Sequence, residues 1–409
     1  MWLYNLGISL YAGGIRLAAL WHGKARLWSE GRRNIFERME AAVRPSDRIV
    51  WVHAASLGEF EQARPIIERL RAEHPEYKIL LTFFSPSGYE IRKNYEGADY
   101  VFYLPADTPS NARRFLDIVH PEIAIFIKYE FWINLLSELR RRKVRSYIVS
   151  AIFRRNSVFF RPYGAMWRQA LETFDTLFVQ NVESKRLLSE IGFDNVVVAG
   201  DTRFDRVAQI AAAAQRVETI ERFRGGGRLF VAGSTWGPDE EILLPLVNAN
   251  PDVKFVIAPH EMDEGRIAHL MRDAKGGAVR YTQCDAATRF DDVQVLVLDT
   301  MGMLSSVYGS ATWAYVGGGF GVGIHNTLEA ATFGLPIAFG PNYGKFKEAR
   351  DMVSLGCAVS VRTAGELAAW FAPLRDDEET LRRVSRTAKD YTARNQGATG
   401  IILRSIFNS

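Results

Sequence analysis

Residues 314–329 read AYVGGGFGVGIHNTLE, and this stretch decides the fold that the sequence predicts. A short apolar strand leads into the glycine-dense loop Gly317–Gly323 and then into a predicted helix over residues 326–333. Glycines let a backbone approach a phosphate closely, and free N–H groups at a helix start bind anions. The spacing fits neither the dinucleotide pattern GxGxxG nor the Walker pattern. The stretch therefore predicts an anion site of the nucleotide type after a strand, or, more simply, glycines that only permit a tight turn.

Short apolar runs alternate with helical stretches on both sides of this loop, which indicates parallel, doubly wound α/β sheets. The strand-like runs cover residues 48–54, 78–83, 100–104, 122–127, 145–150, 176–179 and 195–199, then 229–232, 254–258, 293–298, 313–316 and 336–338. The pattern restarts after residues 200–205 (GDTRFD), and 409 residues suffice for two domains. We therefore predict two similar α/β domains joined near residues 205–228, with Gly225–Gly227 as a hinge.

Composition excludes several classes of protein. The 51 basic and 47 acidic residues leave a net charge of only +4, which is too mild for a nucleic-acid-binding domain. Cys284 and Cys357 lack metal spacing, and no strand ends in an Asp-x-Asp pair, so we predict neither a metal nor a cofactor. Basic residues gather in three segments, residues 24–38, 140–145 and 154–161, as solvated helix faces or as a surface for an anionic partner.

The N-terminal residues 1–15, MWLYNLGISLYAGGI, carry no charged side chain. The run is shorter than the ~20 residues of a spanning helix, and no signal-peptide cleavage site follows it. Trp2, Tyr4, Tyr11 and Trp21 are aromatic residues of the kind that favour a membrane interface. We predict a membrane-associated segment over residues 1–22, spanning or interfacial, with a buried hydrophobic helix as the alternative.

Ligands of open α/β sheets lie beyond the carboxyl ends of the strands, so residues directly after strands are the candidates for a site. Glu59 ends the turn HAASLGE and suits either a general base or a helix capping box with Ser56. Glu130 follows the strand EIAIFI, as a site carboxylate or an ordinary helix-start acid. Arg203 lies between the predicted domains, where a cation could face developing negative charge.

Three further segments follow strands of the second predicted domain. They are Pro259-His260 after KFVIA, Met301-Gly302-Met303 after VLVLD, and the residues that follow the glycine loop. Glu329 lies one turn into the helix there, where a carboxylate suits the paired hydroxyls of a ribose.

Taken together, these motifs resemble the 3-deoxy-D-manno-octulosonic acid (Kdo) transferases of lipopolysaccharide biosynthesis. The resemblance rests on HAASLGE (53–59), EFW (130–132), GDTRFD (200–205), DTMG (299–302), the glycine loop with HNTLEA (325–330), and GPN (340–342). It implies a GT-B glycosyltransferase, an α/β fold in which two Rossmann-like domains face a central cleft. Residues 23–205 would form the acceptor-side domain and residues 206–409 the donor domain, with the C-terminal helical stretch from Glu378 as a candidate to pack back on the first.

The resemblance also implies an inverting transfer of Kdo from CMP-Kdo to lipid IVA, a lipid A precursor, at the cytoplasmic face of the inner membrane. By motif position Glu59 matches the general base, and Glu130 and Arg203 match residues that stabilise the transition state. The implied CMP-contacting residues are Pro259, His260, Met301, Gly302, Met303, Asn326, Thr327, Leu328 and Glu329.

Three positions depart from the family pattern, which often has lysine at Arg203, an acid at Lys128 and proline at Ile133, and they affect the acceptor side most. Two other functions remain open on the residues alone. One is another GT-B nucleotide-sugar enzyme, such as a UDP-sugar transferase or epimerase. The other is a non-catalytic, membrane-bound nucleotide-binding protein.

Overall fold

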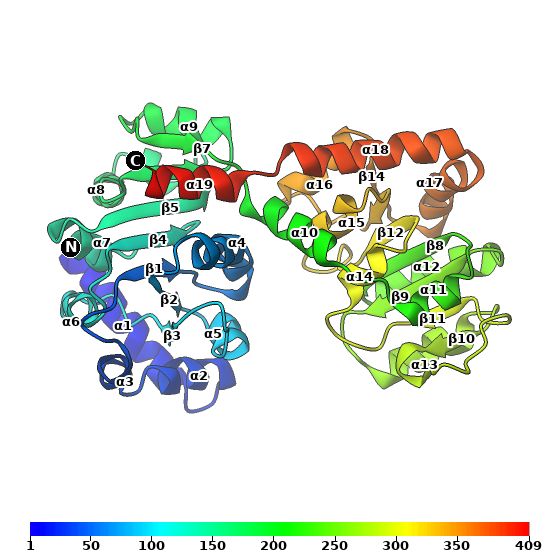
Figure 1. Cartoon of the computed structure of the whole chain (residues 1–409), viewed down its shortest axis with the longest axis horizontal. Helices are drawn as coiled ribbons and strands as arrows, with labels where there is room; N and C mark the ends of the chain where they lie inside the picture. Colours follow the sequence, from blue (N-terminus) through cyan, green and yellow to red (C-terminus); the bar gives the residue numbers. More distant parts are fainter. Residues whose placement is uncertain (409) are drawn as a thin grey trace. The chain divides into compact units, whose positions relative to one another are not determined.

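The computed structural model describes residues 1–408 and shows two α/β units (Figure 1). The first unit contains residues 1–206 together with the described C-terminal residues from Gln396 onward, and the second contains Val207–Asn395. Each unit is built on its own seven-stranded sheet, and all strand pairs in both sheets are parallel.

The sheet of the first unit has the strand order β3-β2-β1-β4-β5-β6-β7. Its strands are β1 (Ile49–His53), β2 (Lys78–Phe83), β3 (Tyr100–Tyr103), β4 (Ile123–Ile127), β5 (Arg145–Ala151), β6 (Thr176–Val179) and β7 (Val196–Val198). Its helices are α1 (Trp2–Ala18), α2 (Gly23–Gly31), α3 (Ile35–Ala42), α4 (Leu57–Glu73), α5 (Pro86–Arg92), α6 (Pro109–Val119), α7 (Ile133–Arg141), α8 (Ala165–Leu171), α9 (Val182–Ser189) and α19 (Ala398–Phe407), while α10 (Thr202–Ala213) leads into the second unit.

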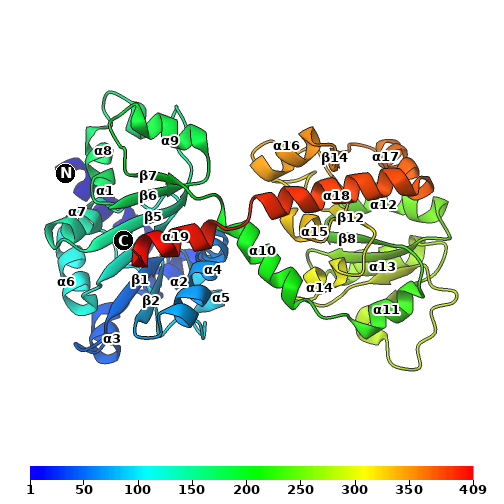
Figure 2. The same ribbon diagram turned by 45° about the horizontal axis from the view of Figure 1, so that its top comes forward.

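Strand β1 is covered by helices on both faces of the sheet. All five residues are buried, and alternate side chains point to opposite faces of a strand. Trp51 packs among α3, α6 and α7 residues on one face, whereas Val50 and Val52 pack with the core residues of α4 and α19 on the other. Helix α19, drawn in red beside α4 in Figure 2, therefore completes the core of the first unit although it comes from the far end of the chain.

The second sheet has the order β10-β11-β9-β8-β12-β13-β14. Its strands are β8 (Leu229–Thr235), β9 (Lys254–Pro259), β10 (Ala278–Arg280), β11 (Val295–Val297), β12 (Trp313–Val316), β13 (Ile337–Phe339) and β14 (Ala358–Ser360). Its helices are α11 (Glu218–Arg224), α12 (Gly237–Ala249), α13 (Glu264–Asp273), α14 (Leu304–Tyr308), α15 (Leu328–Thr332), α16 (Lys347–Ser354), α17 (Ala364–Asp376) and α18 (Glu378–Arg394).

Two sequence expectations need correction. The helix predicted over residues 326–333 is the shorter α15, with Thr327 as its N-cap residue; Asn326 precedes the helix and accepts the Leu328 N–H through its side chain at 3.1 Å. The predicted hinge Gly225–Gly227 lies inside the second unit. Gly225 has φ +59° and ends α11 in the left-handed conformation, which is a helix stop rather than a link between units.

Both sheets place their first strand in the middle and continue on either side of it, so each has a topological switch point. In the first unit the switch lies between β1 and β4, and in the second between β8 and β12. Ligands of doubly wound sheets bind at such points because the loops leave neighbouring strand ends toward opposite faces. Glu59 and Glu130 follow β1 and β4, and the glycine loop follows β12.

Candidate active site

The two acids of the first unit flank its switch point. Glu59 occupies the first turn of α4, directly after β1, and Glu130 lies in the loop between β4 and α7. Lys128 has a left-handed φ of +61°, unusual for a residue with a side chain, and it turns the chain at the end of β4. The turn brings Glu130 back over β1, where its carboxylate lies 3.2 Å from Nε2 of His53.

Glu130 is held by two nitrogen groups. Nε1 of Trp132 donates to its Oε2 at 2.8 Å, and Nε2 of His53 contacts the same oxygen. The Trp132 indole N–H is shared, because it also donates to Nε2 of His53 at 3.1 Å. Glu130 is 11% exposed on its side chain and His53 is fully buried, so the carboxylate faces solvent only through a small opening.

His53 is oriented from behind by a buried hydroxyl. Nδ1 of His53 lies 2.9 Å from Oγ1 of Thr82, on the neighbouring strand β2, and the same Oγ1 accepts a 2.8 Å hydrogen bond from Nε1 of Trp51. Nδ1 of His53 also lies 3.2 Å from the backbone carbonyl oxygen of Thr82, so two atoms of this residue contact the ring nitrogen. The chain Trp51–Thr82–His53–Glu130 thus fixes the direction of the Glu130 carboxylate from the sheet core outward.

Glu59 combines a structural role with an unusual environment. Its Oε2 accepts hydrogen bonds from the backbone N–H of Ser56 at 3.0 Å and from the Ser56 hydroxyl at 3.2 Å, which completes a capping box at the start of α4. Burial, followed by the negative charge of Glu130, raises the pKa of Glu59. A carboxyl group with a raised pKa is the kind that can accept a proton near the working pH. The capping and general-base interpretations therefore coexist in one side chain.

Arg203 belongs to the same unit and is oriented by Asp201. The guanidinium contacts Oδ2 of Asp201 through Nε at 2.9 Å and through a terminal nitrogen at 2.8 Å, and Asp201 also accepts from Nε2 of Gln62 at 3.0 Å. Burial alone would raise the pKa of Asp201, but the Arg203 charge and these hydrogen bonds outweigh it and hold the pKa below its ordinary value. The acid is therefore ionised and fixes a cation at the start of α10.

The glycine loop of the second unit is shaped by its own packing. A Cβ atom on Gly317 would lie 2.2 Å from the backbone oxygen of Ser234, and one on Gly319 would lie 2.6 Å from Cα of Gly340. The buried Asp239 of α12 accepts from the Gly318 N–H at 2.9 Å and from the Tyr315 hydroxyl at 2.7 Å. Gly317 and Gly319 are therefore required sterically, and an acid in the first turn of α12 holds the N–H of the glycine between them.

Aromatic rings join three strand ends around this loop. Trp236 follows β8, His260 follows β9 and His325 ends the loop after β12. The rings of His260 and His325 stack with centroids 4.3 Å apart, and Trp236 lies 4.9 Å from His260 and donates to Nε2 of His325 at 3.3 Å. Burial and then the nearby His260 lower the pKa of His325, so this ring is neutral at pH 7. The stack forms a flat wall of the kind on which a nucleobase packs.

Glu329 is held by two neighbouring side chains. Its Oε2 accepts from the Ser305 hydroxyl at 2.7 Å and its Oε1 from Nδ2 of Asn326 at 3.0 Å. Ser305 belongs to α14, which begins just after the segment Met301–Met303. The Glu329 carboxylate therefore connects the segment after β11 with the segment after β12, so both segments lie beside one acid.

The remaining donor candidates differ in exposure. His260 and Met301 are exposed, Met301 by 80%, and Gly302 takes a left-handed φ of +84°. Pro259, Thr327 and Leu328 are buried, so their contribution to a ligand would come through the backbone or through packing.

Several residues of the two sites were not singled out from the sequence, namely Trp51, Thr82, Asp201, Asp239 and Trp236. Asp239 had a detectable signal, since it stands three residues after Trp236 at a helix start, where it caps α12. Thr82 had none, because a threonine inside a buried strand looks like any other core residue.

Comparison with solved structures shows to which class of fold the chain belongs. It aligns with the UDP-GlcNAc 2-epimerase of Neisseria meningitidis, bound to UDP-GlcNAc, with a TM-score of 0.62, 16% identity, and 88% of this chain and 100% of that chain covered. The match to MurG of Acinetobacter baumannii has a TM-score of 0.56, 12% identity, and coverage of 89% and 100%. The protein therefore has the GT-B fold, as predicted.

Sequence comparisons narrow the class further. The family model for 3-deoxy-D-manno-octulosonic-acid transferase (kdotransferase) matches residues 32–206. Curated Kdo transferases of Haemophilus influenzae and Bordetella pertussis are 25% and 28% identical to the chain, over 87% and 86% of its length and 85% of theirs in both cases. The resemblance read from the motifs is confirmed: this is a glycosyltransferase related to the Kdo transferases of lipopolysaccharide biosynthesis.

Proposed function

We propose that the enzyme transfers Kdo from CMP-Kdo to lipid IVA with inversion at the anomeric carbon. The observation that carries the proposal is the placement of Glu59 and Glu130 at one switch point, with a raised pKa on the first and a fixed orientation on the second. Glu59 removes the proton from a primary hydroxyl of the acceptor glucosamine, and that oxygen attacks the anomeric carbon as CMP departs.

Glu130 and Arg203 assist this step electrostatically. Trp132 and His53 hold the Glu130 carboxylate in one direction, and Asp201 holds the Arg203 guanidinium. Fixed charges need no reorganisation when charge develops in the transition state, and this preorganisation is a large part of enzymatic rate enhancement.

The donor is assigned to the second unit. The His260–His325 stack supports packing of the cytosine ring, and the oxygens of Glu329, presented by Ser305 and Asn326, suit ribose hydroxyls. The segment Met301–Met303 and residues 326–328 complete the proposed CMP contacts.

The acceptor is a lipid, and helix α1 offers a surface for a membrane. Six large apolar side chains on this helix and just after it are 60% or more exposed: Trp2, Leu3, Leu10, Leu17, Leu20 and Trp21. Among residues 1–408 no helix has both the length and the apolar character to cross a bilayer. We therefore propose interfacial attachment at the cytoplasmic face of the inner membrane, with these side chains in the headgroup region.

Mass spectrometry of the product made from CMP-Kdo and lipid IVA tests the proposal, because each added Kdo appears as a defined mass increment. Calorimetric titration with CMP and UDP separates a CMP-Kdo enzyme from a UDP-sugar enzyme of the same fold. A UDP preference, or no product with any lipid A precursor, would remove the proposed reaction.

A further inference from the structure

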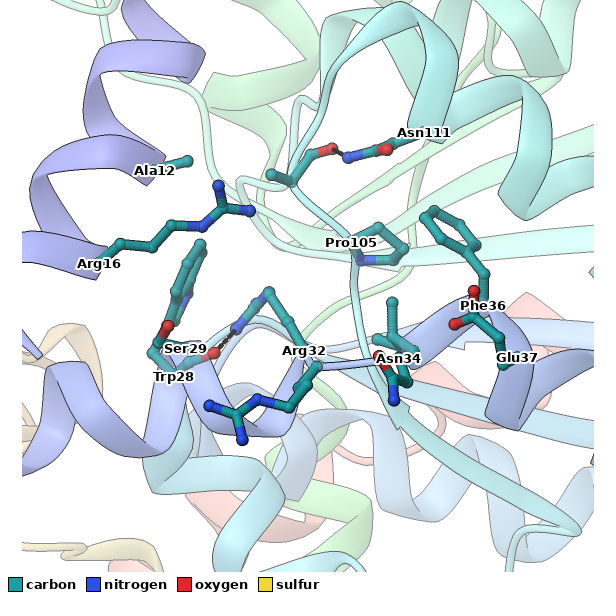
Figure 3. A pocket seen from close by; sticks show the side chains of 13 residues that line it. Ala12, Arg16, Trp28, Ser29, Arg32, Asn34, Phe36, Glu37, Pro105 and Asn111 are labelled. Atoms are coloured by element: carbon teal, nitrogen blue, oxygen red, sulfur yellow. Dashed lines mark hydrogen bonds between the residues drawn. The ribbon is translucent and has the colours of Figure 1, made fainter.

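A cavity of about 410 Å³ lies between helices α1, α2 and α3 and the segment that follows β3 (Figure 3). Its size falls within the ~300–1,000 Å³ of small-molecule sites. Arg16 of α1 points its guanidinium toward the centre of this space, and Ser29 and Trp28 line it from α2. None of these residues belongs to the two sites described above.

The cavity concentrates positive charge that the protein does not neutralise. Within residues 1–408 the guanidinium groups of Arg16 and Arg33, both of which line the cavity, have no side-chain hydrogen bond, ion pair or aromatic contact. The one carboxylate on the lining, Glu37, already faces Arg114 at 3.3 Å.

Arg32 adds a third charge deeper in the wall. It donates to the carbonyl oxygens of Leu104 and Phe84 at 2.8 Å each and to Trp28 at 3.1 Å, and its guanidinium carbon lies 3.9 Å from the centre of the Trp28 ring. All its partners are neutral, and burial lowers the pKa of Arg32 to about 9. Arg32 is therefore still charged at pH 7, in surroundings that would be stabilised by an anion nearby.

The second basic segment contrasts with this cavity. Arg140 pairs with Glu172 at 2.6 Å, and Arg141 and Arg142 both pair with Glu138, at 2.6 and 2.7 Å. These three arginines thus carry their own counter-charges. Arg16 and Arg33 differ from these three arginines in that they line one cavity and face no carboxylate within it.

The position of the cavity indicates which anion would reach it. Arg16 is the immediate neighbour of Leu17, one of the exposed apolar residues of the proposed membrane face. Trp28 and Phe84 pack together, with ring centroids 5.9 Å apart, and Phe84 packs on Trp132 at 4.5 Å. Ala12 and Arg16 of the proposed membrane helix line the cavity, whereas neither Glu59 nor Glu130 does.

We propose that this cavity binds the phosphodiester headgroup of an anionic membrane phospholipid through Arg16 and Arg33. Planar guanidinium groups form paired, charge-assisted hydrogen bonds with phosphate oxygens, and Arg32 supplies a fixed positive field behind them. The site would hold α1 against the bilayer in one orientation. The inference rests on the membrane location given under the proposed function, although not on the transfer reaction itself.

Calorimetric titration with monomeric dihexanoyl phosphatidylglycerol tests the site directly. Arg16→Gln and Arg33→Gln should each weaken binding about tenfold or more, the effect of losing a charge-assisted hydrogen bond. Ser29→Phe keeps every charge but fills the cavity, and it should abolish binding. The control is the double variant Lys24→Gln/Arg26→Gln, which removes two charges from α2 that lie outside the cavity. It should bind dihexanoyl phosphatidylglycerol as the wild type does.

Three results would overturn the proposal. Equal losses in the Lys24/Arg26 control, or full binding by Ser29→Phe, would show general surface attraction and no site. A raised KM for lipid IVA in phospholipid-free detergent, with phosphatidylglycerol binding unchanged in Arg16→Gln and Arg33→Gln, would assign the cavity to the acceptor's phosphate. A chain that binds phosphatidylglycerol as described but makes no Kdo product would reject only the proposed reaction.

Discussion

Replacing Glu59 with glutamine separates its two roles, because the amide keeps the geometry and loses the proton acceptor. Ser56 donates two hydrogen bonds to Oε2 of Glu59, and glutamine serves equally well at the third position of a capping box. We therefore expect the free energy of unfolding of Glu59→Gln to lie within about 1 kcal/mol of the wild-type value. Loss of general-base assistance predicts a fall in kcat of ~10²–10⁴-fold.

The pH dependence of activity tests the role of Glu59 more specifically. Glu59 acts in its ionised form, so activity is lost as pH falls through its pKa. That pKa is raised by burial and then by the charge of Glu130. Glu130→Gln removes the second cause, so the pKa of Glu59 falls and the acid limb of kcat/KM moves to lower pH, while kcat itself drops.

The assay is transfer of radiolabelled Kdo to lipid IVA across a pH series, with CMP affinity measured by calorimetry as the control. CMP binding should be unchanged in Glu59→Gln, since the proposed CMP contacts all belong to the second unit. Full turnover by Glu59→Gln, or an acid limb that does not move in Glu130→Gln, would refute the assignment of Glu59 as the base.

Three other predictions follow from the hydrogen bonds behind the sites. Thr82→Val removes the hydroxyl that orients His53, so kcat/KM should fall and its pH profile should change, with ~1–3 kcal/mol lost in urea unfolding, whereas Thr82→Ser should restore all three. Asp201→Asn removes a charge partner of the half-buried Arg203 and should lower the unfolding free energy by ~1–3 kcal/mol at pH 7. Because the pKa of Asp201 is depressed, its contribution is present above its unfolded-state pKa and disappears as pH falls through its folded-state pKa, so the difference between variant and wild type should vanish in acid unfolding curves. Asp239→Ala frees the glycine loop and should weaken CMP binding about tenfold by calorimetry, against an unchanged CMP affinity in Thr82→Val.

The fold could be predicted from the sequence because its pattern is local. The buried runs at β1 and β12 and the turns that follow them indicate doubly wound sheets without any knowledge of long-range contacts, and the strand-end rule then locates Glu59, Glu130 and Glu329. Their positions after β1, β4 and β12 follow from the order of elements along the chain. The motifs that contain these residues are also local in sequence, so the family resemblance could be recognised from them.

Tertiary structure decided what surrounds these residues. Thr82 contacts His53, and Asp239 contacts Gly318, across 29 and 79 residues of sequence. Arg32 lies half-buried against aromatic rings although it belongs to a basic segment of the sequence. A hydrogen bond or a desolvation depends on which strands pair and which helices cover them, and that information is spread over the whole chain. The sequence therefore determined which side chains stand at the strand ends, and packing determined their partners, their pKa shifts and the cation-lined cavity behind α1.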